Sequence, residues 1–247
     1  MCISCRWAGT SLSRRYWIRP GSRRPEIVFL KNIPIKIPSD LVLSRLKYAK
    51  YKTKADGRIL SFIAGKMDEG HSLVETKAVF AVFDITVKGG AVRFGSSGPR
   101  IKSESLSKHL KGAAKAALFA CTIGKGLGEK VNDYVKRGEI ASATVLDAVG
   151  SEAAEALADE IDRVVTKNAR AEGFSTVTRF SPGYGDWSVF DQGKVLKALK
   201  ASRIGIKATK SYIMVPEKSV TACIGLIRTG AKPVRKVYEG NTRTAKR

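Results

Sequence analysis

The sequence of 247 residues offers little material for metal or disulfide chemistry. It has only two histidines and four cysteines, too few for the disulfide framework of a small secreted domain. Cys121 and Cys223 lie in apolar runs and are predicted to be buried thiols. Cys2 and Cys5 form a lone C-x-x-C, and since no second pair or histidine cluster accompanies it, we expect no metal site.

Long apolar runs are also missing. No stretch approaches the roughly 18 uninterrupted apolar residues of a membrane-spanning helix. The arginine-rich residues 1–25 lack the apolar block of a secretory signal. We therefore expect a soluble, cytoplasmic protein. With 43% hydrophobic and 27% charged residues, the composition is that of a globular chain with one sizeable core.

Acidic residues are scarce, because 45 Lys and Arg face 22 Asp and Glu, a net charge of +23. About half of this excess lies at the ends: residues 1–25 carry six Arg and no acid, and residues 228–247 carry seven basic residues against Glu239 alone. Such a field favours anionic partners, either nucleic acid, an acidic protein or an anionic cofactor. Basic tails are also commonly disordered. We expect a flexible extension over 1–25, a folded domain over 26–227 and a disordered tail over 228–247.

The first part of the folded region alternates between strand and helix patterns. Branched residues and two prolines in 26–37 predict an edge strand followed by a turn. Ser39 or Asp40 can cap a short helix, and Asp56 can cap a second helix that runs to about residue 71. We expect these two helices to pack together as a small layer.

The central part predicts an antiparallel hairpin and a buried strand. Residues 75–94 alternate around a glycine pair, which favours a hairpin. A short helix begins at Ser103 or Ser105, and the apolar run 113–124 is typical of a buried strand.

The longest helical region covers residues 125–171, with a break expected near Gly138. Its second part carries an apolar stripe at spacings of three and four, which indicates a helix packed on a sheet. The stripe consists of Leu146, Val149, Ala153, Leu157, Ile161 and Val164.

The C-terminal part predicts one more helix and one more hairpin. Residues 188–200 are helical, with Val189, Val195, Leu196 and Leu199 expected to point inward. Residues 204–229 give two strands around a Pro-Glu-Lys turn. Because antiparallel pairing is predicted twice, we expect an α+β domain, an antiparallel twisted sheet with flanking helices, over a doubly wound parallel fold. No internal repeat is visible.

Two patterns have ordinary explanations. The glycine-rich run 124–128 follows a strand and opens a helix, but it has the spacing of neither a P-loop nor a dinucleotide site. Several carboxylates also follow one another on the long helix, and the default interpretation is a solvated acidic face. These are Asp147, Glu152, Glu155, Asp159 and Glu160.

The most informative segment is the Pro/Gly-rich loop that contains Arg179 and Tyr184. The planar fork of an arginine can bind an amino-acid carboxylate. Glycine lets the backbone approach a ligand closely, and a tyrosine face attracts a cation such as a sulfonium. On these residues alone, a surface loop with an unpaired arginine remains open.

The spacing Arg-x-x-x-Gly-Tyr at 179–184, together with TKSYIMVPEKSV at 209–220, resembles the paired signature of the activation domain of cobalamin-dependent methionine synthase. LFACTIG at 118–124 and LDAVGSEAAEALADE at 146–160 also resemble free-standing versions of this domain. The resemblance covers roughly residues 32–227, and the two C-terminal motifs are its most specific part.

The resemblance implies a function. Members of this family bind S-adenosylmethionine in a cleft on an antiparallel sheet and present its methyl group to a cobalamin that has been reduced by an electron donor. This chain shows no homocysteine, folate or corrin-binding domain, so we expect it to act in trans. The partners expected are a cobalamin-binding protein, or a methionine synthase without its own activation domain, and a flavodoxin-like or other acidic electron donor. The chain would then be the reactivation component of a methyltransferase system, with no catalytic residue of its own.

The resemblance also implies roles for residues. Arg179 is expected to hold the carboxylate of S-adenosylmethionine, Gly183 to allow close approach and Tyr184 to stand near the methyl donor. Pro182 belongs to the same binding loop. Glu155 matches a carboxylate of the same cleft, where it would accept from the ligand's amino group.

The second motif is expected to face the corrin through a turn that runs from Met214 to Ser219. The chain departs from the family pattern at two points. It lacks a clear counterpart of the N-terminal aspartate that contacts the ligand in the family, and Ser188 stands where a proline usually follows the tryptophan.

Two other interpretations remain. A basic nucleic-acid-binding protein would use the charge and residues 47–54, where lysines alternate with tyrosines. A degenerate family member would keep the fold with an empty cleft. The retained Arg179, Gly183 and Tyr184 argue against the second alternative.

Overall fold

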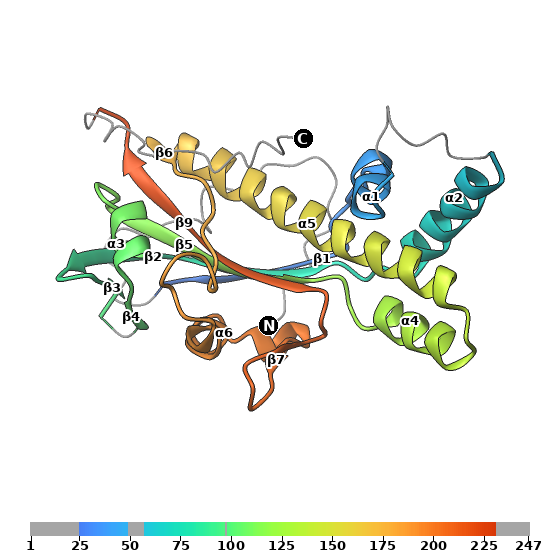
Figure 1. Ribbon diagram of the computed structural model, residues 1–247. Coiled ribbons are helices and arrows are strands. Elements are labelled where there is room, and N and C mark those ends of the chain that lie inside the picture. The colour runs from blue at the N-terminus through green and yellow to red at the C-terminus, as the bar shows by residue number, and fades with distance from the viewer. Residues whose placement is uncertain (1–24, 49–56, 97, 231–247) are drawn as a thin grey trace, which may run out of the picture.

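The computed structural model describes residues 25–48, 57–96 and 98–230. An open, twisted sheet of seven antiparallel strands lies at the centre, with helices on both of its faces (Figure 1). The strand order is β4-β3-β2-β5-β9-β6, and β1 also pairs with β2. The predicted α+β class with an antiparallel sheet is therefore confirmed. The strands are β1 (Ile27–Lys31), β2 (Lys77–Lys88), β3 (Ala91–Phe94), β4 (Arg100–Lys102), β5 (Lys115–Thr122), β6 (Phe174–Thr176) and β9 (Ser219–Arg228).

The long strand β2 organises one side of the sheet. Its first half pairs with β1, where Ile27 lies opposite Ala81, and its second half pairs with β3, where Ile85 lies opposite Phe94. The predicted edge strand and the predicted β2–β3 hairpin are both confirmed. The glycine pair between β2 and β3 has positive φ angles of 57° and 67°, the left-handed conformation that such a turn requires.

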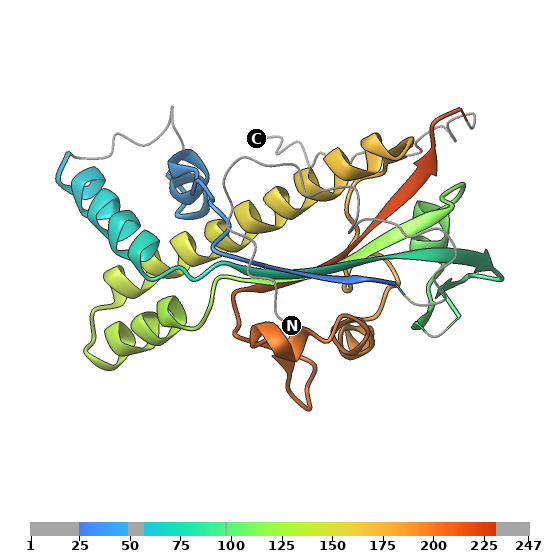
Figure 2. The ribbon, with the colours of Figure 1, turned by 180° about the vertical axis from the view of Figure 1, so that it is seen from behind.

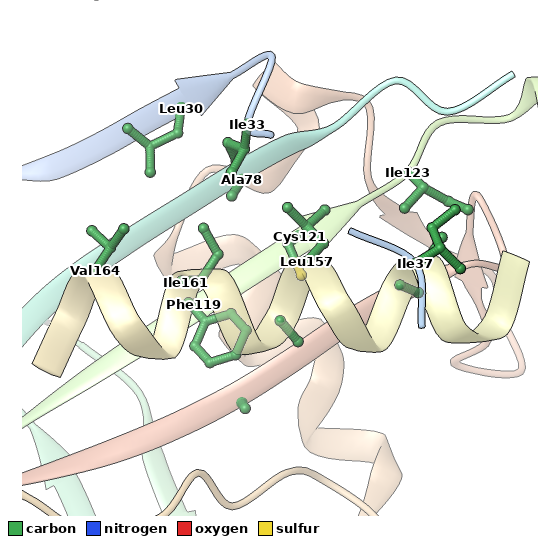
Figure 3. Close-up of a cluster of buried hydrophobic side chains, with 14 of the residues drawn as sticks. Leu30, Ile33, Ile37, Ala78, Phe119, Cys121, Ile123, Leu157, Ile161 and Val164 are labelled. Carbon is green, nitrogen blue, oxygen red and sulfur yellow. The ribbon is translucent and has the colours of Figure 1, made fainter. Parts of the chain in front are cut away.

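One face of the sheet is covered by α5 (Ile140–Ala171), which lies across it diagonally (Figure 1). The predicted apolar stripe is buried, and Figure 3 shows Leu157, Ile161 and Val164 directed toward the strand that carries Phe119 and Cys121. α4 (Gly126–Lys136) precedes α5, and the break falls at Gly138 as predicted. The buried strand β5 is confirmed as well.

α1 (Ser39–Arg45) and α2 (Gly57–Ser72) each pack on α5, so the expectation that they pair with each other as a layer is wrong. The long α5 offers each of them an apolar surface that a seven-residue helix cannot supply. The predicted side-chain cap of α1 is also wrong, because Pro38 occupies the N-cap position and Ser39 already lies inside the helix. The predicted cap Asp56 lies outside the described residues.

The opposite face carries shorter helices (Figure 2). A second core forms there around Phe94, Leu106 and Trp187. Ser103 caps the first of these helices by accepting a hydrogen bond from Leu106 N at 2.9 Å. Of the two predicted starts, Ser103 and Ser105, the structure therefore confirms Ser103. The elements are α3 (Glu104–His109), η2 (Val189–Asp191), α6 (Gln192–Ala198) and η3 (Ala201–Ile204).

Two predictions for the C-terminal part are wrong. β8 (Met214–Val215) pairs with β7 (Lys207–Ala208), whereas β9 pairs with β5 and β6, so no hairpin forms around the Pro-Glu-Lys turn. β9 is buried on both faces over most of its length, which suits an interior strand of the sheet better than half of a surface hairpin. Val189, which the sequence predicts to point inward, is 45% exposed, because it begins the 3-10 turn η2 (Val189–Asp191) and not the regular helix that the sequence predicts there.

Candidate functional site

The candidate site begins at the outer edge of the sheet, where the chain beyond β6 continues along β9. Phe180 N donates to Cys223 O at 2.9 Å, and Cys223 N donates back to Phe180 O at 2.8 Å. Successive residues of an extended segment point to opposite faces of a sheet. Arg179 accordingly contacts α5 on one face, and Phe180 joins the core of the other face.

Arg179 forms an ionic cluster with two carboxylates of α5. Its Nη2 lies 2.6 Å from Glu155 Oε2 and 3.2 Å from Asp159 Oδ1. These two acids are four residues apart and therefore lie one above the other on one face of the helix. The Arg179 side chain is 25% exposed, yet its Nη1 is buried and has no hydrogen-bond partner in the described part of the chain.

The cluster itself has a surplus of negative charge, whereas the surface beside it carries both signs. One guanidinium faces two carboxylates, so the three side chains together carry a net charge of −1. Asp162 lies one turn further along α5, and burial raises its pKa, although a hydrogen bond from Thr166 and the charge of Arg179 act in the other direction. Beyond Asp159 the surface opens into a depression of about 780 Å³ that is lined by α5 residues. Its lining is Asp159, Asp162, Arg163, Thr166, Lys167 and Arg170.

The loop that follows Phe180 is a compact double turn. Gly183 N donates to Trp187 O at 2.7 Å, and Tyr184 N donates to Ser181 O at 3.1 Å. Gly183 has a φ of 95°, in the region that favours glycine. Pro182 is buried, whereas Tyr184 is 64% exposed and its ring lies 6.0 Å from that of Phe180.

Asp186 anchors this loop to the start of α3. Its carboxylate accepts from Ser103 Oγ at 2.6 Å, Glu104 N at 2.8 Å and Ser105 N at 2.9 Å. The hydrogen bond from Ser103 and those from the two backbone amides hold the pKa of Asp186 well below its usual range. On the other side of the loop, Trp187 is buried and stacks on Phe180 with a centroid distance of 6.2 Å. The loop therefore has a fixed conformation.

The structure thus brings Arg179 into direct contact with Glu155. Pro182, Gly183 and Tyr184 lie in the loop that follows Arg179 in the chain. Arg179 contacts α5, whereas the Tyr184 ring contacts Phe180, on the other side of the edge segment. A ligand that touches both side chains has to extend across this edge of the sheet.

The Met214–Ser219 turn lies at the other end of β9. Ser219 is buried, and its Oγ donates to Pro216 O at 2.6 Å, which closes the turn. Met214 is half-buried against the second core. Val215 is 51% exposed and Glu217 is also exposed, and Ile213, just before the turn, is 59% exposed. This turn does not contact Arg179 directly in the described structure.

The acidic face expected on the long helix is not simply solvated. Glu152 is buried and accepts from Arg45 Nε at 2.6 Å, so that interpretation is wrong for Glu152. A helix that is covered by α1 on this side can hold a carboxylate only with a cationic partner. The exposed Asp147, Glu155 and Asp159 are also ion-paired, with Lys218 and Arg179.

Metal and thiol chemistry find little support in the described residues. Within 25–48, 57–96 and 98–230, no group of three or more His, Cys, Asp or Glu side chains is arranged to hold a metal. Cys121 and Cys223 are buried free thiols as predicted, and burial raises the pKa of Cys121 to about 12. No helix in these ranges is long and apolar enough to cross a membrane.

Some predictions fall on residues that the structure does not describe. These are the extension before residue 25, which contains Cys2 and Cys5, the tail from residue 231 onward, and most of the proposed nucleic-acid segment 47–54.

Comparison with known proteins gives a family and a fold. Residues 105–229 match the family model described as "Vitamin B12 dependent methionine synthase, activation domain". A solved structure, described as "Crystal Structure of the MetH Reactivation Domain bound to AdoHcy", superposes with a TM-score of 0.62 at 15% sequence identity, covering 92% of this chain and 84% of that chain. No curated protein sequence matches this chain.

Proposed function

The chain belongs to the family of the vitamin B12 dependent methionine synthase activation domain, and on this premise we propose that it binds S-adenosylmethionine in order to remethylate a cobalamin held by another protein. The similar reactivation domain is described as bound to AdoHcy, the product that remains when S-adenosylmethionine loses its methyl group. A shared ligand class supports the proposal, and the residues of this chain supply the rest of the argument.

The observation that carries the proposal is the partly unsatisfied Arg179. A buried guanidinium nitrogen without a partner is costly and calls for an explanation. Because Nη1 is buried, the Arg179 side chain would turn toward the surface to receive a ligand carboxylate, while Glu155 or Asp159 would accept from the adjacent amino group. This pattern fits the amino-acid end of S-adenosylmethionine, and the net charge of −1 on the cluster complements the net charge of +1 on that ligand.

The loop after Arg179 suits the remainder of the ligand. Gly183 has a positive φ of 95°, and a Cβ there would lie 3.2 Å from Val189 Cγ1, so the loop keeps this shape only with glycine. The exposed Tyr184 ring offers a π face to a sulfonium. Pro182 packs beneath the loop and stiffens it.

The chain's contribution to the reaction is placement. A cobalamin bound by the partner would supply the metal that accepts the methyl group, once a flavodoxin-like or other acidic donor has reduced it. Arg179, Glu155 and Tyr184 would hold the methyl donor in one orientation, which lowers the entropic part of the barrier. The exposed tip of the Met214–Ser219 turn would contact the corrin side of the partner.

The partner itself is a cobalamin-binding protein, either a methionine synthase that lacks this domain or another corrinoid protein. The net charge of +23 would speed its encounter with acidic partners. Such steering weakens as ionic strength rises. Binding to the partner should therefore become slower in 0.5 M salt, mainly through the association rate.

Titration calorimetry with S-adenosylmethionine and AdoHcy tests the proposal. Arg179→Ala should weaken binding about 10- to 150-fold, the loss expected for a hydrogen bond to a charged group. Arg179→Lys should give an intermediate loss, because it keeps the charge without the planar fork. Arg137 pairs with Asp133 on α4, and Arg137→Ala is the matched control that should bind normally. Absence of binding by the unaltered protein would refute the proposal.

A further inference from the structure

Lys218 is covered to an unusual degree for a lysine in a surface turn. Its side chain is only 15% exposed, and its Nζ lies 2.7 Å from Asp147 Oδ1 and 2.9 Å from Ser151 Oγ. The aliphatic stem crosses Gly150, where an added Cβ would stand 3.4 Å from Lys218 Cε. This side chain therefore runs from the Met214–Ser219 turn down onto α5.

The two residues that bind Lys218 continue the row that binds Arg179. Asp147, Ser151, Glu155 and Asp159 follow one another at intervals of four and form one line along α5, here called the α5 ridge. The first two members hold Lys218, and the last two hold Arg179. Ser151 and Glu155 are about 6 Å apart along the helix axis. One rigid helix thus sets the spacing between the turn and the arginine.

The turn depends on this anchor for its direction. Its base is fixed to the sheet, since Lys218 O accepts from Ile123 N at 3.2 Å. Its tip is not packed, because Val215 and Glu217 are exposed. Between the fixed base and the open tip, Lys218 is the side chain that ties the turn to the face where Arg179 lies.

We infer that Lys218 is a positioning residue, which holds the Met214–Ser219 turn in register with Arg179 along the α5 ridge. The inference rests on the proposed function, because it concerns the alignment of a methyl donor at Arg179 with a corrin at the turn. Lys218 itself does not touch the ligand. It acts through the turn, by way of Asp147 and Ser151.

Matched variants separate this role from simple stabilisation. Lys218→Met keeps the stem over Gly150 and removes the two directed hydrogen bonds. Lys218→Arg keeps a cation that can reach Asp147. Asp147→Asn weakens the same anchor from the helix side, and Arg137→Ala again serves as the control on α4.

The experiment follows AdoHcy formation by the full chain from S-adenosylmethionine, with free cobalamin kept in the Co(I) state by titanium(III) citrate. Co(I) supplies the electron pair of the new bond to the methyl carbon and so reaches the Co(III) level, and the electron pair of the broken C–S bond stays on sulfur. We expect Lys218→Met to bind S-adenosylmethionine within about twofold of the unaltered protein while its rate at saturating S-adenosylmethionine falls at least fivefold, or its KM for cobalamin rises as much. Asp147→Asn should show the same split, and Lys218→Arg should restore most of the rate.

Two results would overturn the inference alone. One is a Lys218→Met protein that transfers the methyl group at the normal rate. The other is a parallel loss of melting temperature, S-adenosylmethionine affinity and rate that Lys218→Arg does not rescue, since this would show a purely structural contact. An unaltered protein that binds no S-adenosylmethionine would instead refute the proposed function itself, and the binding isotherm distinguishes the two failures.

Discussion

Two clusters of this molecule each combine cationic side chains with carboxylates, but they differ in how completely their hydrogen bonds are made. In the α2–α4 cluster, Lys66 Nζ donates to Glu69 Oε2 at 2.8 Å and to Tyr134 Oη at 2.6 Å, and Tyr134 Oη donates to Glu69 Oε1 at 2.8 Å. Lys66 and Lys130 also stand over the Tyr134 ring, at 4.2 and 4.7 Å from its centroid. In the Arg179 cluster, one cation faces two carboxylates and leaves Nη1 without a partner.

This difference separates a structural cluster from a candidate binding site. The α2–α4 cluster joins two helices, and Glu69 accepts hydrogen bonds from both Lys66 and Tyr134, so it needs no further molecule. The Arg179 cluster has a surplus of negative charge and an unused donor, so a ligand with one carboxylate and one ammonium would complete it.

The largest effect on stability is expected in the α2–α4 cluster. Tyr134 is buried, and Tyr134→Phe removes a hydroxyl that bonds to two charged groups, so the free energy of unfolding should fall by about 1 to 3 kcal/mol. Affinity for S-adenosylmethionine should stay within about twofold. Urea denaturation and calorimetry on the same variant measure the two quantities. A Tyr134→Phe protein that loses ligand affinity without losing stability would reverse the assignment of the two clusters.

Neutralising the carboxylates of the Arg179 cluster should have a smaller effect, and it should change ligand affinity rather than stability. Glu155 and Asp159 are at least half exposed, so Glu155→Gln or Asp159→Asn should change the free energy of unfolding by no more than about 0.5 kcal/mol. Each should weaken S-adenosylmethionine binding about fivefold, because a partner for the ligand's ammonium is lost. If both variants bind as tightly as the unaltered protein, the surplus negative charge has no role in recognition.

The acid dependence of stability sharpens the comparison. Burial alone would raise the pKa of Glu69, but the hydrogen bonds from Lys66 and Tyr134 outweigh it and lower that pKa. A carboxyl with a lowered pKa in the folded state contributes stability above its unfolded pKa of about 4.3 and loses that contribution as pH falls through the folded value. The stability gap between the unaltered protein and Glu69→Gln should thus be constant from pH 7 to 5 and shrink below pH 4. Urea midpoints across this range test it, and a gap that widens toward low pH would contradict it.

The smallest effect is expected at Cys121, which lies under the Arg179 cluster. Burial raises the pKa of this thiol to about 12, although the charge of Arg179 opposes the shift. Burial raises the pKa of Cys223 as well. In a Cys2→Ser, Cys5→Ser background, neither thiol should react with Ellman's reagent at pH 8 until the protein is unfolded. A fast native-state reaction at Cys121 would mean that the sheet beneath Arg179 opens readily.

The sequence predicts the local parts of this fold well. The stripe on α5 and the turn between β2 and β3 follow from periodicity and from glycine within a few residues, and the structure confirms both. The C-terminal hairpin fails because the true neighbours of β9 are β5 and β6, and β5 lies about 100 residues away in the chain. No local pattern specifies which distant strand a buried strand will join.

The site shows the same limit. Resemblance to a family points to Arg179, Gly183 and Tyr184 because they share one short motif, and it names Glu155 from a second segment. It does not point to Asp159 or Asp186, and it includes Lys218 only as a member of the second motif, although each of the three makes contacts that fix the site. Their partners are between 20 and 83 residues away, so only the folded chain shows the pairing.

The central claim is that Arg179 receives the carboxylate of S-adenosylmethionine, and a crystal structure of the protein with this ligand tests it most directly. We expect the ligand carboxylate within hydrogen-bonding distance of Arg179 Nη1, its amino group at Glu155 or Asp159, and its sulfur on the side of Tyr184. Ligand density elsewhere on the protein, with Arg179 bound only to its two carboxylates, would contradict the claim.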